Sequence, residues 1–365
     1  MSLRMLRRTQ AVGLDLGHHA IRVVDLQRTG AGWQFNKMGW TPTPADAIKD
    51  GVVIDPESVG FAIKHLLSET HIAANSVHIA VAGGSVVVRN VRMPLMPEGT
   101  LRKSIQFEAG RYVPNSVEDS YVEFEILGRT AENQMDVLIV AAPKEIVESR
   151  IAACRVAGLE TESVDVEVFA VYRSLVEADT EGDATDKTIA LVDIGSATTH
   201  ISVVQRGNFA MTRTIGQGGG VLTEALKTYF KLDDENAEAG KAALDLTELL
   251  DDNKPRENPP LRVLQPHVDD LIREIRRSLN YFQSQQTEGT ENKTIDEILL
   301  TGGGSRLAQL SSYVGHKLGI QTRTVGLFDN PRFVRPDAGD DPGCEWGVAC
   351  GLAMRSHARA KAKAA

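Results

Sequence analysis

The sequence of 365 residues is poor in the features that tie small secreted domains together or carry a chain across a membrane. Its three cysteines, Cys154, Cys344 and Cys350, include no C-x-x-C pair, so neither a disulfide framework nor a zinc site is indicated. No run approaches the roughly 20 apolar residues of a membrane-spanning helix. Residues 1–10 carry positive charges without the apolar stretch of a signal peptide, so we expect a cytoplasmic protein.

Positive charge is also in short supply. The chain has 40 Lys and Arg against 49 Asp and Glu, and the net charge of -9 repels the phosphate backbone of nucleic acids. We therefore expect no nucleic-acid partner. The tail at residues 355–365 alternates Ala with Arg and Lys and lacks an apolar face, so we expect a solvated end rather than a membrane anchor.

What the sequence does contain is an internal repeat. The length exceeds the roughly 250 to 300 residues at which a single core stops growing, so at least two lobes are expected. Three short strands are predicted near the N-terminus, and three more follow in the same order in the second half: 12–16, 20–26, 33–40, 188–194, 198–205 and 208–215. Val-Gly-Leu-Asp15-Leu-Gly17 aligns with Ala-Leu-Val-Asp193-Ile-Gly195. A repeat at this long period indicates a duplicated α/β lobe.

A segment that lies outside the repeat separates the two copies. Its pattern predicts strand, helix, strand and strand in turn, at residues 85–92, 99–112, 121–127 and 135–142. A helix from Lys144 to Gly158 and a strand to Val166 then lead back toward the second lobe. We expect a first lobe at 1–84, an inserted subdomain at 85–165, a connecting helix at 166–187, a second lobe at 188–342, and a closing helix with a basic tail at 343–365.

The second lobe carries elements of its own. A helix is predicted at residues 236–244, a polar loop at 251–260, and then a long helix whose apolar stripe is explained by core packing. A strand at residues 297–300 runs into three consecutive glycines, and a further helix is expected to begin near Arg306.

The two copies of strand-Asp-x-Gly-turn-strand are the first candidate site. A hairpin tip of this kind points successive backbone N–H groups at an anion, and glycine lets a phosphate approach closely. This predicts phosphate contacts at Gly17, His18 and His19 in the first copy. The second copy offers the four residues Gly195, Ser196, Ala197 and Thr198. Asp15 and Asp193 would hold Mg²⁺ through water, because this ion keeps several waters and takes few carboxylates. Each hairpin alone could equally be an ordinary tight turn.

Glycine-rich turns supply further candidates. Gly302, Gly303, Gly304 and Ser305 follow a buried strand, where bare backbone could accept a flat base or a phosphate. A plain strand-to-helix connector is the alternative. Gly218 and Gly219 precede another helix and could form a phosphate-side turn or only a hinge.

Two charged residues could complete a nucleotide site. Glu238 and Lys241 are three apart on a short predicted helix, so they share a face where they could meet ribose hydroxyls or an adenine edge. A solvated salt bridge is the alternative. His18 and His19 have no carboxylate or cysteine partner at ligand spacing, so a structural or phosphate-facing role is favoured over zinc.

These motifs together resemble the actin, sugar-kinase and heat-shock-chaperone ATPase superfamily. The first phosphate motif, the second phosphate motif and the adenosine motif Leu300-Thr-Gly-Gly-Gly-Ser305 occur in the superfamily's order, with connecting helices around Glu167 and Trp346. Within it the chain is most similar to the PilM family, and next to the division protein FtsA. Both families place a strand-helix-strand-strand (SHS2-type) subdomain where residues 85–165 lie. His18 and His19 stand where the family usually has small hydroxyl residues.

The resemblance implies an actin-like ATP-binding scaffold with Mg·ATP as cofactor and Glu167 orienting a water for slow hydrolysis at most. It further implies binding to the short cytoplasmic N-terminal peptide of PilN in a groove formed by the insert and first lobe. That contact would link the chain to pilus motor and inner-membrane components and hold it indirectly at the membrane. The alternatives are an FtsA-like division scaffold, a small-molecule kinase of the superfamily, and the cytoplasmic part of a type II secretion protein.

Overall fold

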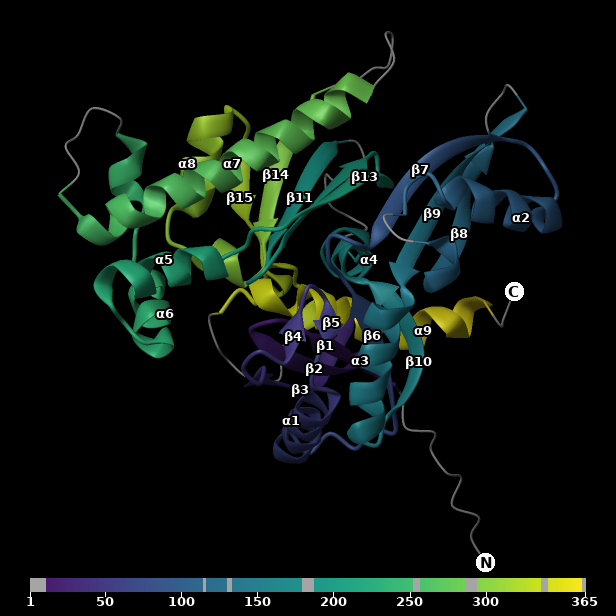
Figure 1. Ribbon diagram of the computed structural model, residues 1–365, viewed down its shortest axis with the longest axis horizontal. Helices are drawn as coiled ribbons and strands as arrows, with labels where there is room; N and C mark the ends of the chain where they lie inside the picture. Colours follow the sequence, from purple (N-terminus) through teal and green to yellow (C-terminus); the bar gives the residue numbers. More distant parts are fainter. Residues whose placement is uncertain are drawn as a thin grey trace, which may run out of the picture.

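The computed structural model describes residues 11–113, 116–129, 133–178, 187–251, 257–285, 294–335 and 341–362, with side chains to residue 357. Figure 1 shows two α/β lobes and a smaller subdomain beside them. Parts of the expected polar loop at 251–260 and of the expected basic tail lie outside the described residues. No helix among the described residues is long and apolar enough to cross a membrane.

The first lobe is a six-stranded sheet in the order β10-β6-β1-β2-β3-β16. Its strands are β1 (Val12–Leu16), β2 (Ala20–Arg28), β3 (Trp33–Pro42), β6 (Ser76–Val81), β10 (Glu160–Val166) and β16 (Phe333–Val334). The small β4 (Ile48–Lys49) and β5 (Val52–Val53) pair with each other outside this sheet. Helices α1 (Pro56–Glu69) and α3 (Lys144–Val156) contact each other. Asp55 caps α1, accepting from the Ser58 N–H at 3.0 Å.

The second lobe repeats the centre of this plan. Its sheet runs β13-β12-β11-β14-β15, and its strands are β11 (Thr188–Ile194), β12 (Thr199–Gln205), β13 (Asn208–Ile215), β14 (Glu297–Thr301) and β15 (Thr322–Thr324). In both lobes the first strand is antiparallel to the second and parallel to a later one, β6 or β14. The expected duplication is therefore confirmed by strand pairing.

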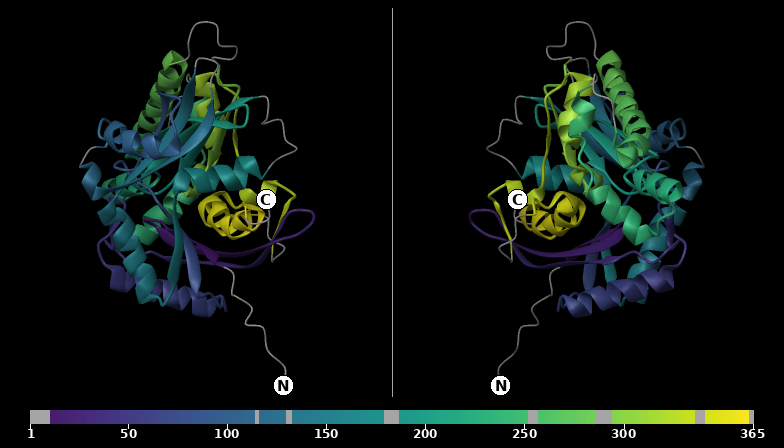
Figure 2. Two further views of the ribbon diagram at one scale, coloured as in Figure 1. Left: turned by 90° about the vertical axis from the view of Figure 1, so that its right-hand side faces the viewer. Right: turned by 90° about the vertical axis from the view of Figure 1, so that its left-hand side faces the viewer.

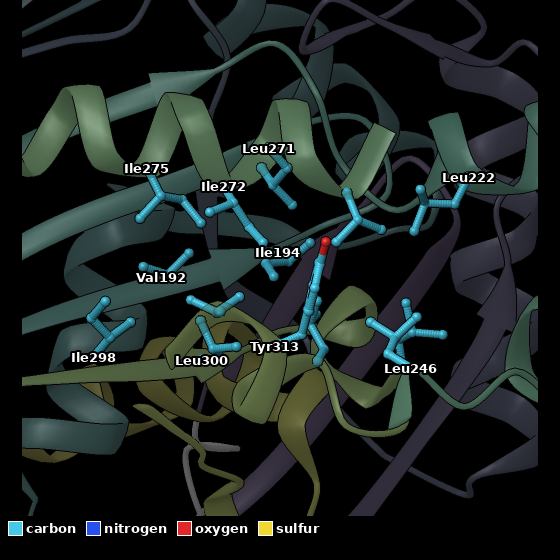
Figure 3. Packing of buried hydrophobic residues seen from close by; sticks show 14 of the residues in the cluster. Val192, Ile194, Leu222, Leu246, Leu271, Ile272, Ile275, Ile298, Leu300 and Tyr313 are labelled. Carbon is cyan, nitrogen blue, oxygen red and sulfur yellow. The ribbon is translucent and has the colours of Figure 1, made fainter. Parts of the chain in front are cut away.

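The second lobe's core forms between its sheet and its helices. These helices are α5 (Gly220–Phe230), α6 (Asp234–Ala242), α7 (Pro259–Gln285) and α8 (Leu310–Leu318). Leu271, Ile272 and Ile275 of α7 point toward Val192 and Ile298 of the sheet (Figure 3). The apolar stripe thus packs in the core as expected. The helix expected near Arg306 begins instead at Leu310, because Gly303–Arg306 forms a short 3₁₀ turn.

The insert is a three-stranded antiparallel sheet, β7-β9-β8, with one helix. It consists of β7 (Val87–Pro94), α2 (Glu98–Ala109), β8 (Ser120–Arg129) and β9 (Gln134–Pro143). The order strand-helix-strand-strand is as expected, but the boundary at residue 165 is corrected. Strand β10 pairs in parallel with β6, and α3 packs on α1, so both belong to the first lobe. The insert is therefore residues 87–143.

Two helices run between the lobes. Helix α4 (Glu167–Tyr172) continues into a π-helical segment, Arg173–Glu177, and packs against α9 (Gly347–Ala362). Seen end-on, α9 lies directly against the first lobe's sheet (Figure 2), and it contacts β1, β2 and β6. These two helices carry the chain across the base of the cleft, at the positions predicted for the connecting and closing helices.

Candidate functional site

The two hairpin turns that carry the Asp-x-Gly motif have the same hydrogen bond. The Gly17 N–H donates to Ala20 O at 3.2 Å, and the Gly195 N–H donates to Thr198 O at 2.9 Å. Each turn directly follows the strand that carries Asp15 or Asp193. The duplicated sequence therefore builds duplicated turns, and both face one cleft between the lobes.

Three buried carboxylates meet at the base of this cleft: Asp15, Asp193 and Glu167, the first residue of α4. Burial and the neighbouring charges of Glu167 and Asp193 raise the pKa of Asp15 to about 7. Burial and the charge of Glu167 likewise raise the pKa of Asp193 to about 6. Because like charges gather here away from water, the site favours a bound cation.

His200 provides the counterpart to Glu167. Its Nε2 lies 3.5 Å from Glu167 Oε2, and its Nδ1 lies 3.1 Å from the Thr214 hydroxyl. Burial acts to raise the pKa of Glu167, but the hydrogen bond and charge of His200 outweigh it and hold the pKa below its usual value. Glu167 raises the pKa of His200 against the effect of burial. The pair is thus an ionised carboxylate held by an imidazolium.

Two arginines that the sequence analysis missed balance the remaining charge. Arg22 lies opposite Asp15 on β2, with Nη1 3.9 Å from Asp15 Oδ2, and it lines the cleft. Arg150 of α3 is 1% exposed and donates to the backbone carbonyls of Gly51, Leu16 and Ala80 at 3.0 to 3.2 Å. Arg22 was readable as the pairing partner of Asp15 in the first hairpin, whereas Arg150 sits in an ordinary amphipathic pattern and gave no signal.

The glycine triplet lies against the second phosphate turn. Gly302 has a φ of +82°, and a Cβ there would lie 2.2 Å from Asp193 Oδ1. Only glycine tolerates this conformation so close to a carboxylate. Gly303 and Gly304 line the cleft, but Ser305 does not. Its buried hydroxyl donates to Gly302 O at 2.8 Å, so Ser305 holds the turn and its expected ligand contact is corrected.

The second glycine run also splits into two roles. Gly219 lines the cleft. Gly218 does not, because it packs against the second phosphate turn, where a Cβ would lie 2.4 Å from Gly195 O. The expected ligand contact of Gly218 is therefore corrected to close packing between two backbone segments.

Glu238 and Lys241 form an ion pair inside the cleft. Lys241 Nζ lies 2.7 Å from Glu238 Oε2 and 2.8 Å from the Thr223 hydroxyl. Burial acts to raise the pKa of Glu238, but its hydrogen bonds to Lys241 and Thr223 outweigh this and lower it. Both the salt bridge and the position in the cleft were considered from the sequence, and both are present.

His18 and His19 lie at the tip of the first phosphate turn and line the cleft. Burial and the charge of Arg150 lower the pKa of His18, so its imidazole is neutral near pH 7. Among the described residues no three His, Cys, Asp or Glu side chains converge to hold a metal directly.

The cleft has a volume of about 770 Å³, in the range of small-molecule sites. The predicted residues that line it are Asp15, Gly17, His18, His19, Glu167, Asp193, Gly195, Ser196, Ala197, Thr198, Gly219, Glu238, Lys241, Gly302, Gly303 and Gly304. The donor set fits Mg²⁺: oxygen ligands of high negative charge, too few for a protein cage, with the other ligands left to water and phosphate.

Comparison with known proteins narrows the meaning of this fold. The solved structure titled "PilM-PilN type IV pilus biogenesis complex" superimposes with a TM-score of 0.82 at 27% identity, covering 96% of this chain and 99% of that chain. MreB5 of Spiroplasma citri bound to AMPPNP matches with a TM-score of 0.53 at 13% identity over 97% of both chains, which shows the actin-like fold alone.

Sequence relatives include the cell division protein FtsA. The Pseudomonas aeruginosa protein is 24% identical over 367 residues, covering 87% of this chain and 84% of its own length. The Streptococcus pneumoniae protein is 22% identical over 264 residues, and the match covers 65% of this chain but only 56% of that relative. These likenesses are distant.

A family model described as type IV pilus assembly protein PilM matches residues 13–357, nearly the whole chain. The two-lobed fold, the insert and the duplicated turns agree with that match, and the chain belongs to the PilM family of type IV pilus assembly proteins.

Proposed function

We propose that the cleft binds Mg·ATP and that the bound nucleotide sets how the protein presents a peptide groove to its membrane partner. The observation that carries the first part is the meeting of Asp15, Asp193 and Glu167 between two hairpin turns of identical hydrogen bonding. A divalent cation relieves the repulsion that raises the pKa values of the two aspartates.

The roles of the residues follow from their places. The turn amides after Gly17 and Gly195 donate to phosphate oxygens, and Asp15 and Asp193 orient Mg²⁺ through its waters. Gly303 and Gly304 provide bare backbone for the base, while Glu238 and Lys241 meet the ribose or the base edge. When bound, Mg²⁺ neutralises phosphate charge.

Glu167 orients a water near the terminal phosphate, and hydrolysis is slow. His200 and Thr214 hold that carboxylate on one side, and it has no acid or base partner aligned with it beyond His200 among the described residues. We expect turnover well below the roughly 1 to 1,000 per second of typical enzymes.

The partner in this proposal is the N-terminal peptide of PilN, as in the solved complex that the chain resembles. The groove lies between the insert, residues 87–143, and the first lobe. The protein then acts at the cytoplasmic side of the inner membrane through PilN and links it to the other components of the pilus machine.

Calorimetry of ATP binding with and without Mg²⁺ tests the nucleotide site. The double variant Asp15→Ala, Asp193→Ala should lose the Mg²⁺-dependent part of the affinity. Asp270→Ala removes an exposed carboxylate on α7 that pairs with Arg273, and it should bind as the wild type does. Equal binding by wild type and double variant, or binding by neither, removes the nucleotide proposal.

A labelled PilN N-terminal peptide tests the partner. It is titrated into the wild type and into a variant in which residues 87–143 are replaced by a short Gly-Ser linker. ATP binding by this variant shows that its lobes are folded. Peptide binding that survives the deletion places the groove elsewhere, and no binding by the wild type favours the division scaffold, since FtsA relatives match most of the chain.

A further inference from the structure

Phe209 of the second lobe packs directly on the connecting helix α4. Its ring centroid lies 5.1 Å from that of Phe169 and 6.0 Å from that of Tyr172, in edge-to-face contacts at 67° and 86°. The Tyr172 hydroxyl also donates to Gly207 O at 2.5 Å, which fixes the β12–β13 turn against the same helix. Aromatic contacts of this geometry are favourable and directional. A shift of α4 therefore displaces the turn and Phe209.

The same residue also contacts the insert. Asn90 of β7 donates from Nδ2 to Phe209 O at 3.4 Å, and the ring packs against a cluster that includes Val88 and Leu138 of the insert. Strands β7 and β13 are edge strands of their sheets, and they contact each other at this point. Figure 1 shows the insert approaching the second lobe along these two strands.

The seam between these strands is loosely packed. A cavity of about 230 Å³ lies between them, and its walls include Val88 and Leu138 of the insert and Met211 and Tyr281 of the second lobe. Close-packed interfaces leave few voids larger than a water molecule. The insert can therefore move relative to the second lobe while the contact at Phe209 is kept.

Helix α4 connects this contact to the cleft. It begins at Glu167, whose carboxylate faces the cleft and contacts His200, and Phe169 follows two residues later. The cleft, α4, Phe209 and the insert thus form one continuous path of packed side chains. Such a path can pass on a change only if the contact differs in free energy between two arrangements of the lobes.

We infer that Phe209 couples the nucleotide cleft to the peptide-binding insert, which rests on the proposed function and specifies its regulation. A nucleotide that draws the lobes together moves α4 and the β12–β13 turn, and Phe209 carries this movement to β7. Without Phe209 the two ligands bind independently. The coupling between two sites is reciprocal, so peptide strengthens ATP binding by the same factor, in the range of about 5- to 150-fold.

The test measures a ratio rather than an affinity. The dissociation constant of the labelled PilN peptide is measured with and without ATP for the wild type, Phe209→Ala, Phe209→Leu and Asn90→Ala. The wild type should show a ratio of about 5 or more, and Phe209→Ala a ratio below about 2, with each affinity measured alone unchanged within about twofold. Phe209→Leu keeps the apolar contact with the insert and should restore part of the ratio.

A control separates this role from general loss of an aromatic side chain. Phe107 of α2 is 74% exposed on the insert, so Phe107→Ala should keep the full ratio. Should Phe209→Ala fail to fold, Asn90→Ala decides, because this exposed residue provides the only printed hydrogen bond to Phe209 from the insert and should lower the ratio by itself.

Hydrogen exchange of the wild type gives an independent reading. ATP should change the protection of β7 as well as the cleft turns, and in Phe209→Ala only the cleft turns should respond. A full ratio in Phe209→Ala and Asn90→Ala overturns the inference while leaving the proposed function in place. A ratio of 1 in the wild type, with both ligands bound, overturns the nucleotide-dependent part of the proposed function and the inference with it.

Discussion

His200 on strand β12 lies with its Nε2 3.5 Å from Oε2 of Glu167, the first residue of α4. One residue belongs to the second lobe's sheet and the other begins the helix that connects the lobes. The contact therefore ties the connecting helix to the sheet at the point where both face the cleft.

Replacing His200 with Ala should destabilise the protein through Glu167. The substitution leaves a buried carboxylate without its hydrogen-bonded counter-charge, which costs on the order of 1 to 3 kcal/mol of unfolding free energy. In a Glu167→Gln background the same change should cost less, because no charge remains to be stranded. A double-mutant cycle by urea denaturation measures the difference.

An exposed pair provides the control for that cycle. His65 and Glu69 lie on α1 with side chains 69% and 62% exposed, so His65→Ala should cost less than about 0.5 kcal/mol. Strictly additive costs for His200→Ala and Glu167→Gln would show that the two side chains do not stabilise each other.

The sequence predicts the parts of the fold that depend on local pattern. The duplicated Asp15 and Asp193 hairpins, the order of elements in the insert and the apolar stripe of α7 all follow from short-range spacing, and all are present. The cleft residues were found because the two hairpins and the glycine triplet recur as recognisable motifs. Duplication made the sequence informative about the site.

Features that depend on distant partners could not be read in this way. Strand β10 pairs with β6 some 80 residues earlier, and nothing local distinguishes that pairing from an exit toward the second lobe. Arg150 occupies a polar position of an amphipathic helix, and only the folded chain reveals its burial. Gly218 and Ser305 have the composition of ligand-binding turns, but tertiary packing turns them toward the backbone.

Arg150→Met should be strongly destabilising. The guanidinium donates to the carbonyls of Gly51, Leu16 and Ala80, and its removal leaves these buried acceptors unpaired. An unpaired buried polar group costs about 1 to 3 kcal/mol, so a total above about 2 kcal/mol is expected. The pKa of Asp15 should also rise further, because Arg150 is one of the charges that lower it.

Arg155→Met on the same helix is the matched control. Arg155 is exposed, and its substitution should change the unfolding free energy by less than about 0.5 kcal/mol. Equal effects of the two substitutions in urea denaturation would contradict the role given to the three carbonyl contacts of Arg150.

The buried thiols predict a loss of stability in alkali. Burial raises the pKa of Cys154 from 9.0 to about 11, so between these values the unfolded chain releases a proton that the folded chain keeps. Unfolding is therefore favoured as pH rises from 9 to 11, by about 2 to 3 kcal/mol for this group. Denaturation at stepwise pH should show this fall, and Cys154→Ala should make it smaller. Rapid reaction of folded protein with a thiol reagent at pH 8 would contradict it.

The last prediction concerns the crossing of the two helices between the lobes. A Cβ added at Gly351 of α9 would lie 1.9 Å from Ala170 O of α4, a clash with backbone that no side-chain rotation relieves. Gly351→Ala should therefore force the helices apart and cost about 1 to 3 kcal/mol or more in urea denaturation. Because α4 begins at Glu167, the same variant should weaken ATP binding measured by calorimetry. Gly240→Ala, in a helix with no atom near the added Cβ, should instead be neutral or stabilising by up to about 1 kcal/mol. If Gly351→Ala kept both the stability and the ATP affinity of the wild type, the close crossing of α4 and α9 would not be what holds Glu167 in the cleft.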